Sequence, residues 1–338
     1  MWYSPSGAAH RVPLVVSLAA AVVLITACGE EPTSYNPSTS SPSPMPVLAT
    51  AALGSWTEKA PMPTFRRGLA GAVLKNASGQ YLFYTIGGSN NSNPAMRRVE
   101  AYNVATNTWT RRASLPTDRR TPSAATIGSK IYVVGGIDLT GTPTKTLYVY
   151  NQTSNTWSRK ADLPAPSARG MSGVINGRLY HIVANSTGTF GASRLYRYNP
   201  STDKWTRLAD PIHNHFGGFA GVIEDKLYAA WGLSPLTDVY DPVLNRWALA
   251  GPGEVVTGTA SAVLGKRLYA MGGHDDDDNI SDGASAYDPV TKTWIEKAIM
   301  HVIRNGAAAG TVRNTAGQSR IVVAGGNEGS PSTEMYTP

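Results

Sequence analysis

Six positions, each ten residues after one of six regularly spaced tryptophans, hold the side chains best suited to chemistry in this sequence. The six residues are Arg66, Arg119, Ser167, His215, Thr257 and Arg304. The guanidinium group of arginine offers a fixed fork of donors that fits carboxylate and phosphate groups. Arginines in three equivalent places therefore predict an anion-binding site, although the same side chains could instead bond neighbouring loops of the fold.

Further polar and aromatic side chains stand close to these positions. Arg67 and Arg120 flank two of the arginines, and Arg169 lies two residues beyond Ser167. Trp231 replaces the first of two glycines that recur in the chain, and it could stack on a sugar ring or simply fill space. His213, like His215, has no more specific interpretation than a surface histidine. The predicted ligand-binding set is Arg66, Arg119, Arg169, His215, Trp231 and Arg304.

An acidic segment, HDDDDNISDG at residues 274–283, is the one candidate for a metal site. Its aspartates, Asp275–Asp278, could coordinate Ca²⁺ through oxygen. The alternating ligand spacing of a calcium loop is absent, however, and Ile280 stands where that loop needs glycine. A solvated loop is the favoured interpretation. Because the sequence also lacks the GxSxG, HExxH and phosphate-loop motifs, we assign no catalytic residue, metal or cofactor.

A repeat of about 48 residues must position these side chains. The tryptophans that define it are Trp56, Trp109, Trp157, Trp205, Trp247 and Trp294. Five of them follow a tyrosine by seven residues, across turn sequences such as NPSTDK and DPVTKT. A strand ending in paired glycines, as in YVVGG, precedes each pair in most repeats, and a segment of small residues comes before that strand. Each unit is therefore predicted to contain four strands and no helix.

These motifs resemble kelch repeats, the four-stranded blades of a β-propeller. The resemblance covers residues 56–338 and implies an all-β, six-bladed kelch-type β-propeller with four antiparallel strands in each blade. Trp56 has no tyrosine before it, whereas Tyr336 has no tryptophan after it. We therefore expect the N-terminal strand around Trp56 to complete the last blade, which closes the ring and leaves no open sheet edge.

Composition agrees with a globular domain rich in turns. The chain has 338 residues, of which 34 are Gly and 23 are Pro, and only 16% are charged. This share of charge excludes a disordered polyelectrolyte and a charged coiled coil. A single cysteine excludes an internal disulfide framework. The net charge of +7 is modest and gives no reason to expect a nucleic-acid partner.

The N-terminal segment is interpreted as a targeting signal. An apolar run from Val12 to Ala27 is too short to favour a membrane span and suits a secretory signal. It ends in Ile-Thr-Ala-Cys28, which resembles the lipobox of bacterial lipoproteins, although an ordinary signal peptide is the alternative. We expect a signal peptide at 1–27, a Pro/Ser/Thr-rich tether at 28–52 and the propeller at 53–338. The protein would then be exported and lipid-anchored at Cys28, on the periplasmic or cell-surface side.

The function favoured by the sequence is binding. We expect a monomeric, membrane-tethered module that recognises a protein or anionic glycan through the loop face of the propeller. One alternative is a sugar-modifying enzyme resembling the six-bladed kelch sialic acid mutarotases, in which Asp138 or Glu328 could move protons. A second alternative is a purely structural envelope lipoprotein.

Overall fold

The structure is a computed structural model. The residues that it describes form twenty-four β-strands, joined by turns and loops, and no helix. These residues are 53–183, 193–326 and 331–338. They belong to the unit Thr50–Pro338; a second unit, Met1–Ala49, lies outside the described residues. The expected signal peptide and tether, Cys28 included, are therefore not described. None of the described residues form a helix that could cross a membrane.

The strands group into six sheets, here called blades 1 to 6. Blade 1 contains β2 (Ala70–Lys75), β3 (Tyr81–Ile86), β4 (Val99–Asn103) and β5 (Thr108–Arg111). Blade 2 contains β6 (Ser123–Ile127), β7 (Lys130–Val134), β8 (Leu147–Asn151) and β9 (Thr156–Lys160). Blade 3 contains β10 (Met171–Ile175), β11 (Arg178–Val183), β12 (Arg194–Asn199) and β13 (Lys204–Arg207).

The other three blades follow the same plan. Blade 4 contains β14 (Phe219–Ile223), β15 (Lys226–Ala230), β16 (Leu236–Asp241) and β17 (Arg246–Pro252). Blade 5 contains β18 (Ala260–Leu264), β19 (Arg267–Met271), β20 (Ala284–Asp288) and β21 (Thr293–Glu296). Blade 6 contains β22 (Ala308–Arg313), β23 (Ser319–Ala324), β24 (Thr333–Thr337) and β1 (Ser55–Lys59).

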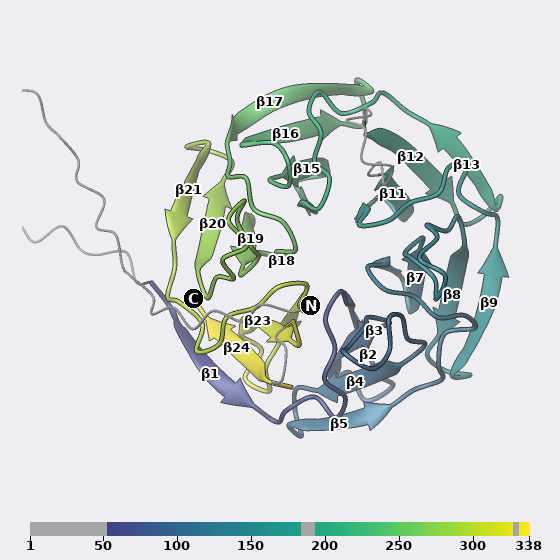
Figure 1. Ribbon diagram of the computed structural model, residues 1–338, viewed down its shortest axis with the longest axis vertical. Helices are drawn as coiled ribbons and strands as arrows, with labels where there is room; N and C mark the ends of the chain where they lie inside the picture. The colour runs from purple at the N-terminus through teal and green to yellow at the C-terminus, as the bar shows by residue number, and fades with distance from the viewer. Residues whose placement is uncertain (1–52, 184–192, 327–330) are drawn as a thin grey trace, which may run out of the picture. The chain divides into compact units, whose positions relative to one another are not determined.

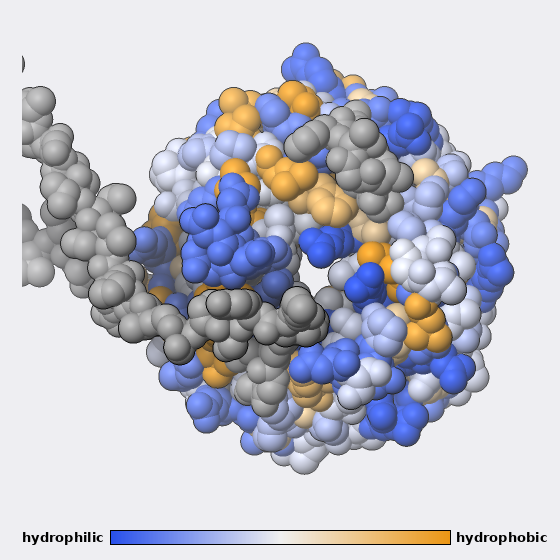
Figure 2. Space-filling model, in the orientation of Figure 1, coloured by the Kyte–Doolittle hydropathy of each residue, from blue (hydrophilic) through white to orange (hydrophobic). Residues whose placement is uncertain are grey.

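The blades form a closed ring whose first strands surround a central channel (Figure 1). Within each blade the strands pair antiparallel in chain order, except that β1 supplies the outer strand of blade 6. Trp56 of β1 lies opposite Tyr336 of β24 in this pairing. The predicted six-bladed propeller is therefore confirmed, and so is its closure by the N-terminal strand. Figure 2 shows the ring hollowed at its centre.

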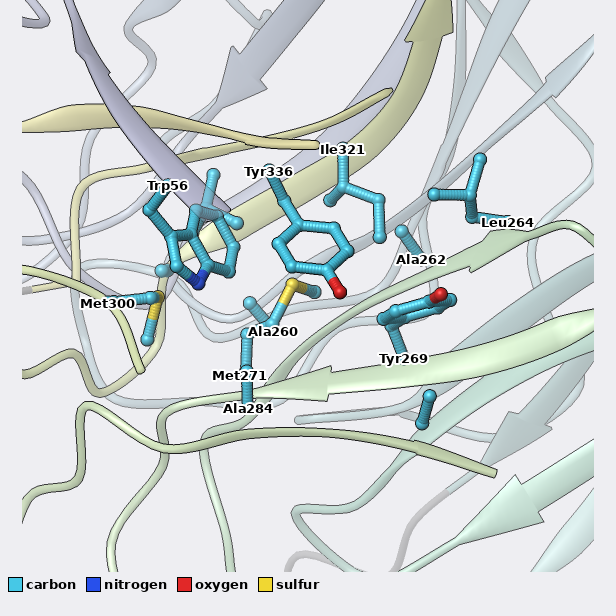
Figure 3. Packing of buried hydrophobic residues seen from close by; sticks show 13 residues of the cluster. Trp56, Ala260, Ala262, Leu264, Tyr269, Met271, Ala284, Met300, Ile321 and Tyr336 are labelled. Carbon is cyan, nitrogen blue, oxygen red and sulfur yellow. The ribbon is translucent and has the colours of Figure 1, made fainter. Parts of the chain in front are cut away.

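Aromatic side chains fill the wedges between neighbouring blades. The ring centroids of Trp56 and Tyr336 lie 5.1 Å apart in the cluster between blades 5 and 6 (Figure 3). The equivalent rings of Tyr102 and Trp109 in blade 1 lie 5.3 Å apart. Trp109 also donates a 2.8 Å hydrogen bond to the carbonyl oxygen of Ala60, in the segment that leads from blade 6 into blade 1. The repeating tryptophan thus both packs the wedge and ties adjacent blades together.

The paired glycines end the second strands where the loops of adjacent blades meet. Gly87 has a φ of 68°, in the left-handed region that favours glycine. A Cβ at this position would stand 2.6 Å from the carbonyl oxygen of Arg119 in blade 2, too close for a carbon–oxygen contact. Glycine therefore lets the loops of blades 1 and 2 approach each other at the mouth of the channel.

Candidate ligand site at the mouth of the channel

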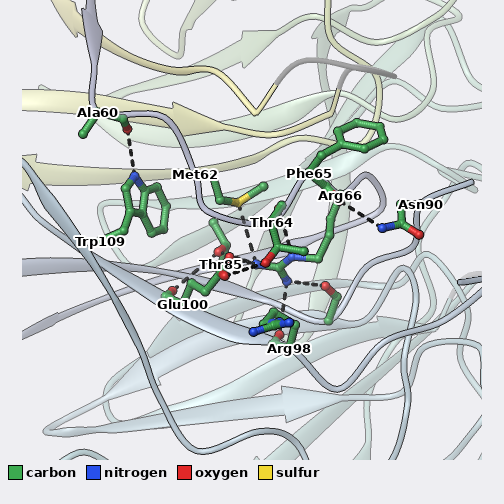
Figure 4. A network of polar contacts seen from close by, with 11 residues as sticks. Ala60, Met62, Thr64, Phe65, Arg66, Thr85, Asn90, Arg98, Glu100 and Trp109 are labelled. Carbon is green, nitrogen blue, oxygen red and sulfur yellow. Dashed lines mark hydrogen bonds and ion pairs between the residues drawn. The ribbon is translucent and has the colours of Figure 1, made fainter. Parts of the chain in front are cut away.

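The first of the six predicted positions, Arg66, is turned into blade 1 and is fully buried. Its Nη2 donates to Oε2 of Glu100 on β4 over 2.7 Å, and to the hydroxyl of Thr85 over 3.0 Å (Figure 4). Its Nη1 donates to the carbonyl oxygen of Gly87. Burial lowers the pKa of Arg66 to about 10, although the charge of Glu100 opposes this shift. Arg66 therefore clamps the end of β3 to β4.

Arg304 repeats this arrangement in blade 6. It is fully buried, and its Nη2 lies 2.7 Å from Oε2 of Glu334 on β24. Its Nη1 donates to the carbonyl oxygen of Gly325 over 2.7 Å. In both blades the acid stands two residues before the repeated tyrosine, a spacing in the sequence that could have identified these buried partners.

The remaining four positions also bond within their own blades. Arg119 is almost fully buried and donates to the hydroxyl of Thr146 over 3.1 Å. Blade 2 has Tyr148 at the position where blades 1 and 6 have a glutamate. The hydroxyls of Ser167 and Thr257 each lie 2.9 Å from Nε2 of a histidine, His181 and His274 respectively. His215 is fully buried against Asp238. This geometry favours a role in bonding the fold, and the ligand contacts predicted for Arg66, Arg119, His215 and Arg304 gain no support from it.

Trp231 is buried as well, between blades 4 and 5. Its ring centroid lies 4.8 Å from that of Trp294 and 5.2 Å from that of Phe219. A Cβ added to Gly253 would stand 2.9 Å from Trp231. Most other blades carry a buried side chain at the position of Gly253, six residues after the tryptophan, such as Leu115 and Met300. Trp231 therefore fills the space that this glycine leaves, which favours packing over sugar stacking.

A cavity of about 350 Å³ lies at the mouth of the channel, where loops of all six blades meet. Three arginines from three consecutive blades line it: Arg67, Arg120 and Arg169. Among the other described lining residues are Ser89, Thr121, Thr259 and Asn305, and no aspartate or glutamate is among them. Arg169 belongs to the predicted ligand set. Arg67 and Arg120 stand out in the sequence only as neighbours of that set.

Backbone pairing decides which arginines face this cavity. Arg67 exchanges two backbone hydrogen bonds with Ser89, of 2.9 and 2.8 Å, and Arg120 does the same with Ile137, of 2.9 and 2.8 Å. These bridges hold the loops in extended conformation, in which consecutive side chains point to opposite sides. Arg66 and Arg119 therefore point into the blades, whereas the residue after each points into the cavity. A one-residue step separates the buried arginines from the accessible ones.

The third arginine of the cavity, Arg169, is held in a different way. Its backbone is left-handed, with a φ of 54°, and its guanidinium group lies 5.6 Å from the ring centroid of Phe216 in the loop of blade 4. Loss of hydration lowers the pKa of Arg169, and repulsion from Arg120 lowers it further. An anion bound between Arg120 and Arg169 would reduce the repulsion between these two cations.

The carboxylates considered for proton transfer do not line this cavity in the described part of the chain. Oδ1 of Asp138 accepts hydrogen bonds from the backbone N–H groups of Thr140 and Thr142, over 2.9 and 3.0 Å. The hydroxyl of Thr140, more than the backbone bonds, lowers the pKa of Asp138. Glu328 lies outside the described residues. Asp138 is therefore not among the described residues that line the cavity with the arginines.

The acidic loop of blade 5 is organised by its own hydrogen bonds. Oδ1 of Asp275 accepts from the backbone N–H groups of Asp277 and Asn279, over 3.0 and 2.9 Å. Hydrogen bonds from Asn279 lower the pKa of Asp275. Among the residues that the structure describes, no group of three or more His, Cys, Asp or Glu side chains is placed to hold a metal ion.

The sheet order, the closure by β1 and the paired glycines together define a six-bladed β-propeller with blades of the kelch type. The chain belongs to the kelch-repeat family. The family model for the KLHDC2/KLHL20/DRC7 Kelch-repeats domain matches residues 47–229, and that for the Kelch motif matches residues 256–301. A propeller of this family suggests a protein-interaction module or a kelch-type enzyme.

Individual relatives resemble only parts of the chain or its fold. Kelch-like protein 21 from Bos taurus and from Homo sapiens is 43% identical over 58 residues, and that from Mus musculus is 41% identical over the same length. These matches cover 17% of this chain but only 10% of the relatives. A solved structure titled "Structure of YjhT" superposes with a TM-score of 0.62 at 16% identity, over 81% of this chain and 95% of that one. This likeness shows the fold alone.

Proposed function

We propose that this propeller is a binding module that holds an anionic group of a protein or glycan partner in the cavity formed around Arg67, Arg120 and Arg169. The observation that carries the proposal is that three arginines from three consecutive blades line one cavity. Hydrogen bonds from guanidinium to carboxylate are charge-assisted and stronger than neutral ones. The residues described as lining the cavity include no carboxylate.

The size of the cavity narrows the kind of group that it accepts. A volume of about 350 Å³ is at the lower end of small-molecule sites. It suits a single acidic sugar ring or an acidic side chain or chain end, with the rest of the partner lying on the surrounding loops. Thr121, Thr259 and Asn305 add neutral hydrogen-bonding groups around the cations.

A glycan and peptide array tests this proposal even though the partner is unidentified. We expect the bound members of the array to share a carboxylate or another anionic group, and binding to weaken as salt is added, because surface charges are screened. The Arg111→Ala variant, which alters an exposed arginine on the outer strand of blade 1, serves as the control and should bind the same members. Selection of neutral or cationic members would contradict the proposal.

We also propose that Cys28 carries a lipid that tethers the propeller to a membrane on the non-cytoplasmic side. The support for this part of the function is the sequence of residues 12–28 and the Pro/Ser/Thr-rich segment after it. Labelled fatty acid should be incorporated into the protein in bacteria, and the Cys28→Ala variant should lose the label and leave the membrane fraction. Equal labelling of the two proteins would overturn the tether.

A further inference from the structure

Buried clamps of one design hold the loops at the mouth of the channel in blades 1 and 6. An arginine donates to a glutamate on the third strand of the blade and to the carbonyl oxygen of the glycine that follows the second strand. In blade 1 the arginine is Arg66, its acid is Glu100 and its glycine is Gly87. In blade 6 these are Arg304, Glu334 and Gly325. Because arginine stays charged at all physiological pH values, these two clamps do not respond to pH.

Blade 4 builds the same clamp from a histidine. Nε2 of His215 lies 3.1 Å from Oδ2 of Asp238 on β16, and Nδ1 lies 3.1 Å from the carbonyl oxygen of Trp231 after β15. A carbonyl oxygen can only accept, and an ionised carboxylate can only accept. Both contacts are hydrogen bonds only when both ring nitrogens donate, which requires the imidazolium form. His215 is thus the titratable counterpart of Arg66 and Arg304.

The acid of this clamp is held in the ionised form. Burial opposes ionisation of Asp238, but hydrogen bonds from His215 and His213 outweigh burial and leave the pKa of Asp238 below its ordinary value of 3.8. His213 contributes its backbone N–H, at 3.1 Å, and Nδ1, at 2.9 Å. An ionised Asp238 in turn favours a proton on His215.

Trp231 stands in blade 4 where blades 1 and 6 have a glycine, and its backbone conformation makes the clamp of blade 4 less stable. Trp231 has a φ of 60°, in the left-handed region, where Gly87 and Gly325 have values of 68° and 72°. A non-glycine residue in this conformation is strained and persists only when its surroundings hold it. The hydrogen bond from His215 to the carbonyl oxygen of Trp231 is one of the interactions that hold it.

The clamp connects directly to the ligand cavity. His215 is followed by Phe216, whose ring lies against the guanidinium group of Arg169. Gly217 and Gly218 line the cavity, and the N–H of Gly218 donates to the carbonyl oxygen of His215 over 2.9 Å. The segment 215–218 therefore links the proton on His215 to the position of a cavity arginine.

Charged and titratable groups around His215 come from several elements. Asp238 and His213 contact the clamp directly, Arg169 lies across the ring of Phe216, and Glu254 lines a second cavity with Trp231 on the side of blade 5. Arg169 carries a like charge, whereas Asp238 contacts His215 directly in the buried clamp and favours its charged form.

We infer that His215 is a proton-dependent clamp, so that the cavity at the channel mouth is ordered and binds anions more tightly at acidic pH than at alkaline pH. The part of this inference that concerns anions rests on the proposed function. As the pH rises, His215 loses one proton and one of its two hydrogen bonds, and Trp231 and segment 215–218 lose an anchor. An isolated histidine changes its charge near neutral pH, so the experiments below compare about pH 5.5 with about pH 8.

The protonation of His215 is tested directly by NMR of the ¹⁵N-labelled imidazole in the protein without ligand. At about pH 5.5, where an isolated histidine is largely charged, both ring nitrogens should carry protons and show the hydrogen-bonded shifts of imidazolium. These signals should convert to a single-N–H form as the pH is raised. A neutral ring at acidic pH would overturn the inference, whatever the behaviour of any variant.

Amide hydrogen exchange tests the clamp itself, with His215→Arg as the matched variant that copies blades 1 and 6. After correction for the intrinsic pH dependence of exchange, wild-type protection of residues 215–218 and 231–232 should fall several-fold between about pH 5.5 and about pH 8. The His215→Arg variant should show no such fall. A His215→Gln variant should resemble the alkaline wild type at every pH. Equal pH dependence in the wild type and in both variants would overturn the clamp.

Sulfate, whose charge is constant over this range, tests the link to the cavity. Wild-type affinity for sulfate should fall several-fold over the same pH range, whereas that of His215→Arg should not. If exchange shows the clamp but neither protein binds sulfate, the proposed anion site fails and the clamp stands. If both proteins bind sulfate with the same pH dependence, the link fails and the anion site stands.

Discussion

Arg66 and Arg67 are neighbours in the sequence, but their side chains lie on opposite sides of one loop. Arg66 is fully buried and paired with Glu100 over 2.7 Å, whereas Arg67 is exposed and lines the cavity at the channel mouth. Arg119 and Arg120 repeat this division in blade 2. The first arginine of each pair therefore belongs to the stability of the fold, and the second to the surface that meets a ligand.

Removal of one partner of the buried pair Arg66–Glu100 should strongly destabilise blade 1. The Arg66→Ala variant leaves the carboxylate of Glu100 buried without its cation, which costs about 3–5 kcal/mol of the free energy of unfolding. Urea denaturation measures this loss. The exposed Arg111→Ala variant should stay within about 0.5 kcal/mol of the wild type. A loss of less than about 1 kcal/mol for Arg66→Ala would show that Glu100 is solvated, contrary to the structure.

The pH dependence of stability should carry the signature of His181, which is fully buried between Ser167 and Ser172. Burial lowers the pKa of His181 from 6.5 to about 3. Between these values the unfolded chain binds a proton that the folded chain excludes. The stabilisation is therefore complete above pH 6.5 and declines as the pH falls toward about 3, by on the order of several kcal/mol.

Valine stands in blade 2 at the position of His181, as Val133, so the His181→Val variant is the matched comparison. Denaturation of both proteins at a series of pH values isolates the histidine, since every other titrating group is shared. The wild type should lose more stability on acidification than the variant. Parallel curves for the two proteins would mean that His181 binds a proton as readily in the folded state as in the unfolded chain.

Trp231 offers a test in which two effects oppose each other. Replacement by glycine relieves a left-handed backbone, a gain of about 1–2 kcal/mol, but empties the wedge that Trp231 fills beside Gly253, a loss of about 3–5 kcal/mol. The loss is larger, so Trp231→Gly should be less stable than the wild type by about 1–4 kcal/mol in urea denaturation. A variant at least as stable as the wild type would show that relief of strain fully offsets the lost packing at this site.

Closure of the ring depends on β1, so Trp56 should matter beyond its own strand. Trp56 packs against Tyr336 and donates a 2.7 Å hydrogen bond to the carbonyl oxygen of Ala298, at the end of blade 5. The Trp56→Ala variant should lose about 3–5 kcal/mol and expose β24 as a sheet edge. Hydrogen exchange should show the largest loss of protection in β24. Loss spread evenly over all six blades would argue against a local opening at the closure.

The blade count and the closure could be predicted because the propeller repeats one packing problem six times. Tyr102 and Trp109 recur with their equivalents seven residues apart, since each wedge needs the same large rings. Gly87 recurs in most blades, where neighbouring loops approach too closely for a side chain. Short-range patterns of this kind survive in the sequence even when the blades differ elsewhere.

The candidate site was only partly predictable, since the direction of a loop side chain depends on pairing with another loop. The bridge between Arg67 and Ser89 turns Arg67 toward the cavity and Arg66 away from it, and nothing local distinguishes the two arginines. The clamp of His215 had a signal: Asp238, like Glu100 and Glu334, precedes the repeated tyrosine by two residues. That spacing identifies a buried partner only once the strand register is known.

The central claim, that the cavity arginines bind an anionic partner, is tested most directly by affinity of the Arg120→Ala/Arg169→Ala double variant for the best anionic member of the array. Loss of two charge-assisted contacts should weaken binding by about 100-fold or more, while the thermal midpoint stays close to that of the wild type. The Arg111→Ala control should bind as the wild type does. Unchanged affinity of a folded double variant would contradict the account.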